Sequence, residues 1–104
     1  NTAEGWYLKS LEISEKINNL YGVANTTHQL GRVSMMKGDL QTAGRMLIHA
    51  TSIFLSRQNF GNASISTKSF LALLQQAHPD ERKTFLDLWR EAGLPSLPNT
   101  EEEE

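Results

Sequence analysis

The segment 24–50 constrains what this chain can fold into more than any other stretch of its sequence. The pair Gly38-Asp39 divides it, because glycine ends helices and a following aspartate can accept hydrogen bonds from the free amides of the next helix. Small and apolar residues recur at helical spacing on both sides; they are Leu30, Gly31, Ala43, Leu47 and Ala50. The segment therefore predicts one helix, a tight turn and a second helix that leans back on the first.

Gly31 lies in the middle of the first of these two helices and needs a structural reason. Glycine in a helix interior is about 1 kcal/mol less favourable than alanine. The usual compensation is the close approach of another backbone, which a Cβ atom would prevent. The small residues Ala43 and Ala50 indicate the same tight contact from the second helix.

The remaining sequence continues the helical spacing of apolar residues. We predict an all-α fold of about five helices, at residues 3–18, 23–37, 40–57, 63–77 and 80–92. Tyr21-Gly22 and residues 59–62 are the expected turns, and Asn62 is the expected N-cap of the fourth helix.

The C-terminal part of the chain carries its own boundary signals. Pro79 lies near the first turn of the fifth helix and Gly93 just past its end, which is the usual asymmetry of helix termini. Residues 94–104 end in four glutamates and show no pattern that could form a core. We expect them to be an exposed acidic tail.

Two parts of the chain repeat each other. At an offset of forty residues the matching pairs are Ala3 and Ala43, Tyr7 and Leu47, Ser10 and Ala50, and Ile13 and Ile53. Residues 21–24 match residues 60–63 at an offset of thirty-nine, and we assign the difference of one residue to a loop. A period in this range is typical of stacked helix pairs, in which one unit cannot bury its apolar face alone. We therefore divide a repeat domain at 1–93 into a second helix without its first, a complete unit, and a third unit or cap; these are residues 3–18, 23–57 and 63–92.

This stretch of the chain resembles the tetratricopeptide repeat. The positions that match its pattern are Leu30, Gly31, Gly38, Asp39, Ala43 and Ala50, and those that depart from it are Thr27, Ser34 and Leu47. The spacing exceeds the roughly 34 residues of the standard unit. It is similar to the extended repeats of kinesin light chain, of the Leu-Gly-Asn family of polarity adaptors and of bacterial sensor and regulatory proteins, and segments 8–13, 22–24 and 28–31 resemble the bacterial type most. The resemblance implies antiparallel helix pairs stacked as a right-handed superhelix.

The resemblance also implies a binding surface, because the first helix of each unit lines the concave face and holds a partner peptide. The residues implied are Asn25, His28, Gln29, Arg32 and Met35, with Met36 beside them, and in the next unit Ser64, Thr67, Lys68 and Leu71. Amide side chains would pair with the partner's backbone, Arg32 with a carboxylate and Met35 with an apolar anchor. Arg32 and Lys68 together favour an acidic partner. An ordinary solvated helix face is the alternative for each of these residues.

Charge and composition argue against several other functions. Ten Lys or Arg against twelve Asp or Glu give a net charge of −2, whereas binding to nucleic acid needs a basic surface. No apolar run approaches the ~20 residues of a membrane span, and no signal peptide is visible, so we expect a cytoplasmic protein without membrane contact.

The sequence offers no set of residues suited to chemistry. It contains no cysteine, and His28, His49 and His78 do not share a helix face at metal-binding spacing. No nucleophile elbow, phosphate loop or paired-carboxylate motif is present. We expect no metal, no cofactor and no enzymatic activity.

The sequence favours a non-enzymatic module for protein–protein interaction, expected to be a fragment of a larger protein because it begins inside a predicted helix. Two alternatives stay open: a structural or oligomerisation segment whose repeats only stack, and a regulatory sensor arm of a multidomain signalling protein. Trp6 and Trp89 are expected to fill core or interface positions. If the truncated N-terminal face exposes Trp6, Tyr7 or Leu8, those residues would drive self-association. We expect the acidic tail to continue a helix or to lie against a basic groove.

Overall fold

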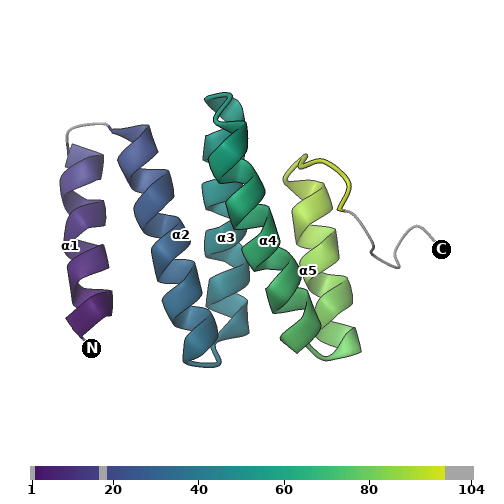
Figure 1. Ribbon diagram of the computed structural model, residues 1–104. Coiled ribbons are helices and arrows are strands. Elements are labelled where there is room, and N and C mark those ends of the chain that lie inside the picture. The colour runs from purple at the N-terminus through teal and green to yellow at the C-terminus, as the bar shows by residue number, and fades with distance from the viewer. Residues whose placement is uncertain (1, 17–18, 98–104) are drawn as a thin grey trace.

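The structure is a computed structural model that describes residues 2–16 and 19–97. In these residues it has five helices and no strand: α1 (Thr2–Lys16), α2 (Leu20–Met36), α3 (Leu40–Ser56), α4 (Phe60–Gln76) and α5 (Pro79–Glu91). The helices stand side by side in one array, with α1 and α5 at its opposite ends (Figure 1). The predicted all-α fold of stacked antiparallel helices is confirmed. None of these helices is both long and apolar enough to cross a membrane.

The helices begin at evenly spaced caps. The side chains of Asn19, Asp39 and Asn59, each twenty residues after the last, accept a hydrogen bond from the amide three residues further on. Each cap amide also donates to the carbonyl five residues earlier, at 2.8–2.9 Å, which satisfies a free carbonyl of the preceding helix. Gly38 and Gln58 precede two of these caps and have positive φ, at 84° and 58°. One turn geometry thus recurs along the chain.

The recurring caps correct three sequence predictions. The chain does not turn at Tyr21-Gly22 or at residues 60–62, because both segments lie inside the first turn of a helix. The N-cap of α4 is Asn59 and not Asn62, whose amide is the donor to the Asn59 side chain at 3.3 Å. Since α2 and α4 begin at Leu20 and Phe60, the repeat offset is forty throughout, and the offset of thirty-nine was wrong.

The array has two layers, because alternate helices also touch: α2 contacts α4, and α3 contacts α5. Gly31 explains the fit of α2 on α3, since a Cβ added there would lie 3.1 Å from Leu47 Cδ2. The predicted close approach at Gly31 is therefore confirmed, but a buried side chain makes it and not a backbone. Gly44 has the same role between α3 and α5, where an added Cβ would lie 2.9 Å from Phe85 Cε1.

The core lies between the packed helices and is made of small and large apolar side chains. The predicted buried positions Ala43, Leu47 and Ala50 are fully buried, and Phe70 stacks on Trp89 with ring centroids 4.6 Å apart. A polar contact crosses the α3–α4 interface, where the Thr51 and Ser66 hydroxyls, both fully buried, lie 2.6 Å apart. Each hydroxyl also reaches a carbonyl on its own helix, so neither lacks a partner.

The chain does not become an exposed tail at residue 94, as the sequence had suggested. α5 has 13 residues where α2, α3 and α4 have 17, so apolar surface of α4 and Trp89 remains to be covered. Residues 94–97, here called the C-terminal strap, fold back over it: Leu97 is only 7% exposed, and Trp89 Nε1 donates a hydrogen bond to the Pro95 carbonyl at 2.7 Å. The four terminal glutamates, and with them the expected helical or groove-bound tail, lie outside the described residues.

Two glycine substitutions test the packing at the α2–α3 contact. Gly31→Ala gains helix propensity, but its methyl group overpacks the fully buried Leu47, so we expect a net loss of about 1 kcal/mol in the free energy of unfolding. Gly5→Ala, in α1 with nothing within 4 Å of an added Cβ, should gain about 1 kcal/mol. Urea unfolding followed by circular dichroism measures both. Equal stabilisation by the two variants would contradict the tight contact.

Candidate functional site

The exposed side of the layer formed by α2 and α4, here called the α2/α4 face, contains most of the residues that the sequence proposed for binding. On α2, Asn25 and Arg32 are exposed and Gln29 is half-buried. Met36, one helical turn beyond Arg32, is 84% exposed. These four side chains follow one another at three- and four-residue spacing and so form one stripe along the helix.

His28 does not belong to this exposed stripe. Its side chain is only 5% exposed, and its Nε2 lies 3.0 Å from the Ser69 hydroxyl of α4. Burial lowers the pKa of the imidazole, and the positive charge of Arg32 lowers it further. The structure therefore corrects the proposed partner contact. His28 faces α4, which covers that side of α2, so its side chain joins the two helices and is not free to bind a partner.

Met35 is likewise not a free anchor, since it is half-buried and packs against the main core cluster. The neighbouring Met36 is the exposed methionine. Sequence spacing placed both near the stripe, and the packing of α2 in the fold decides between them.

The corrected offset of forty changes which residues of α4 correspond to the stripe on α2. Ile65, 53% exposed, is the counterpart of Asn25, and Lys68 is the counterpart of His28. Lys68 is exposed, and it lies about 100° around α4 from Ser69, which contacts α2. Lys68 therefore stands at the edge of the α2/α4 face that is farther from α2. Of its predicted neighbours, Ser64 is exposed and Thr67 donates a hydrogen bond to the Ala63 carbonyl at 2.8 Å.

The segment from residue 17 to residue 79 carries mostly positive charge. Between residues 17 and 79 the only acidic residue is Asp39. The cations in the same range are Arg32, Lys37, Arg45, Arg57 and Lys68. Neither α2 nor α4 carries a carboxylate, so the α2/α4 face is positive although the whole chain has a net charge of −2.

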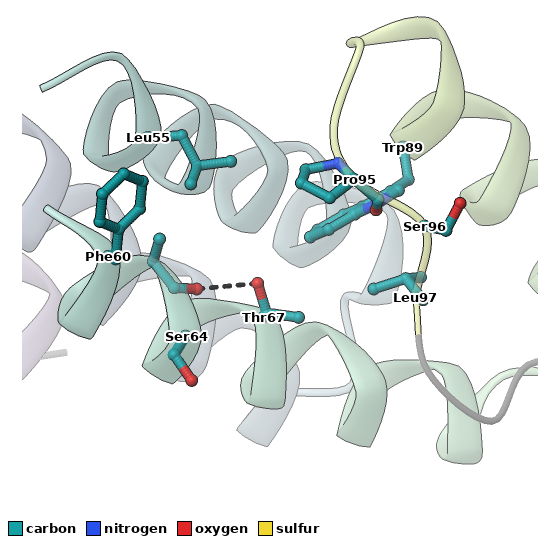
Figure 2. A pocket seen from close by; sticks show the side chains of 9 residues that line it. Leu55, Phe60, Ser64, Thr67, Trp89, Pro95, Ser96 and Leu97 are labelled. Carbon is teal, nitrogen blue, oxygen red and sulfur yellow. Dashed lines mark hydrogen bonds between the residues drawn. The ribbon is translucent and has the colours of Figure 1, made fainter. Parts of the chain in front are cut away.

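A second concave feature lies between the start of α4 and the C-terminal strap. It has a volume of about 180 Å³. Figure 2 shows Leu55 and Phe60 on one side and Trp89, Pro95 and Leu97 on the other, with the Thr67 hydroxyl turned to its own helix. It is the space that α5 leaves by ending early. Its volume is close to that of a cavity of roughly 150 Å³ that holds one benzene molecule.

A third hollow, of about 290 Å³, lies in the other layer between α3 and α5. Ile48, Leu88 and Ala92 supply its apolar part, and Arg45 and His49 its polar part. Ser52, three residues from His49 on α3, also lines this hollow. In the described part of the chain, no group of three His, Asp or Glu side chains is placed to hold a metal ion.

Comparison with known proteins adds no relative: no family model, no curated protein and no solved structure matches the chain. The geometry and charge of its surface are therefore the basis for assigning a function.

The buried His28 makes a pH dependence of stability testable. Its folded-state pKa is lowered from the ordinary 6.5, so on acidification the unfolded chain binds a proton there before the folded chain does. We expect the free energy of unfolding to fall as the pH drops below about 6.5, until the lowered pKa is passed. Urea titrations across this range should show a shallower fall for His28→Gln. His49→Gln, a change on the exposed side of α3, is the matched control; a change in slope of the same size in both variants would contradict the assignment to His28.

Proposed function

We propose that this chain is a non-enzymatic, cytoplasmic protein-interaction module of the tetratricopeptide type, and that its α2/α4 face binds an acidic peptide or partner helix. The observation that carries the proposal is a row of exposed polar and apolar side chains on two neighbouring helices that have no carboxylate between them. Such a face attracts negative charge and has no internal partner for its cations.

Arg32 is the residue expected to contribute most to recognition. Its guanidinium group presents a planar fork of donors that matches a carboxylate, and it stands between Gln29 and Met36 on the exposed stripe of α2. Lys68 adds a second positive charge at the far edge of the face. A partner whose carboxylates span the two helices would use both.

Apolar contacts can supply the rest of the affinity. Met36 on α2 and Ile65 on α4 are both more than half exposed, and each can cover an aliphatic side chain of the partner. The amides of Asn25 and Gln29 can exchange hydrogen bonds with a peptide backbone. Beneath this surface, the contact of His28 with Ser69 links α2 to α4.

The charge reversal Arg32→Glu tests the proposal directly. Synthetic peptides that combine Asp or Glu with Leu should bind the unmodified chain better than the same peptides with Lys in place of the acids. A hydrogen-bonded charge pair contributes about 1.5–3 kcal/mol, so Arg32→Glu should weaken binding of the acidic peptides at least about tenfold. Fluorescence anisotropy with labelled peptides measures the affinities.

Arg45→Glu is the matched control, because it makes the same charge change on α3 beside the hollow of the other layer. It should leave peptide binding nearly unchanged. If Arg45→Glu weakens binding and Arg32→Glu does not, the partner uses the α3/α5 side and the proposed surface is wrong.

A further inference from the structure

The hollow beside the C-terminal strap continues an interface that is filled in the preceding helix pair. There, Ala24 of α2 packs in one core cluster with Phe54, which lies in the last turn of α3. At the offset of forty, Ser64 of α4 is the counterpart of Ala24, and Ser64 lines the hollow. Because α5 has 13 residues where α3 has 17, it lacks the turn that would supply a counterpart of Phe54. An aromatic ring thus fills the first of two equivalent places, and the hollow is the second.

The strap forms a wall of the hollow and does not supply this ring. Leu94 packs against the main core cluster, and Pro95 and Leu97 stand at the side of the hollow. Phe60 stands across from them and is 65% exposed (Figure 2). Between these walls the described residues leave a volume of about 180 Å³, which is enough for one six-membered ring.

The hydrogen bonds around the hollow favour a ring without polar atoms. Trp89 Nε1 already donates to the Pro95 carbonyl at 2.7 Å, and the Thr67 hydroxyl donates to the Ala63 carbonyl at 2.8 Å. A ligand therefore finds neither of these donors free. A phenyl ring needs no hydrogen-bond partner when it is buried, and it can pack against the indole of Trp89 at an angle or offset.

We propose that the hollow binds the phenylalanine side chain of the acidic peptide that the α2/α4 face holds, an inference that rests on the function proposed above. The hollow adjoins the far edge of that face, because Ser64 stands one helical turn before Lys68 on α4. A phenylalanine in the hollow brings a neighbouring carboxylate of the peptide toward Lys68, and α4 has no carboxylate of its own to compete. The recognised motif is thus a phenylalanine next to Asp or Glu.

Labelled synthetic peptides with a central phenylalanine or alanine test the site, each in an acidic form and in a neutral form with Gln in place of the acids. Burial of the ring should make the phenylalanine peptide bind at least about tenfold more tightly than its alanine match in both forms, as measured by fluorescence anisotropy. Equal affinities of the phenylalanine and alanine peptides would overturn the proposal. A phenylalanine preference without any preference for the acidic form would support the aromatic site and contradict the acidic partner proposed above.

Phe60→Ala removes one wall of the hollow, and because Phe60 is mostly exposed the fold should be retained. This variant should lose most of the preference for phenylalanine and bind the alanine peptides as before. Leu8→Ala is the matched control, since Leu8 is also exposed, at 52%, but lies on α1 at the other end of the array (Figure 1). It should leave the preference unchanged.

The fluorescence of Trp89 locates the bound ring independently. The chain contains two tryptophans, and Trp6, which is 68% exposed, can be replaced by phenylalanine so that Trp89 alone is observed. In the Trp6→Phe chain the acidic phenylalanine peptide should change the Trp89 emission, and its alanine match should not. A phenylalanine preference that survives Phe60→Ala and leaves the Trp89 emission unchanged would place the ring elsewhere and overturn the proposal.

Discussion

The contact between α2 and α3 around Gly31 and Leu47 supports the rest of the structure. Leu47 is fully buried and lies close to where a Cβ of Gly31 would be, so the two helices approach as closely as a glycine permits. Gly44 repeats this arrangement toward α5, where it leaves room for the Phe85 ring. Dense packing of this kind holds each helix at a defined distance and rotation. The surface side chains inherit their positions from it, and the stripe on α2 is exposed because its opposite side is held against α3.

The even spacing of the caps turns this local contact into an array. Asn19, Asp39 and Asn59 begin helices at intervals of twenty residues and bond back to the preceding helix in the same way. α4 therefore begins forty residues after α2 and with the same cap hydrogen bonds. The pattern ends where α5 is shortened and the C-terminal strap takes over the covering role, with Trp89 bonded to the Pro95 carbonyl. An array built by repetition has two end surfaces, and the α1 end is the more apolar and exposed one among the described residues.

Charge distinguishes the surface that we propose for binding. The α2/α4 face is positive because its helices lack acidic residues, and this directs the search for a partner toward acidic segments. His28 connects the first surface to the core: its Nε2 lies 3.0 Å from the Ser69 hydroxyl of α4, and burial lowers the pKa of its imidazole.

The sequence by itself determined the features that depend on a few neighbouring residues. The helical periodicity, the stop at Gly38, the cap at Asp39 and the burial of Ala43, Leu47 and Ala50 could all be read from local spacing, and Asn25 and Arg32 were placed on an exposed stripe. Only the tertiary structure decided the burial of His28, the exposure of Trp6 against the burial of Trp89, the return of residues 94–97 and the position of Lys68. These depend on which helix, if any, lies against each side of another, and that is set by elements distant in the sequence. The one-residue error in the repeat offset has a related cause: the glycines at 22 and 61 look like turn residues, and only the cap hydrogen bonds show that the helices begin before them.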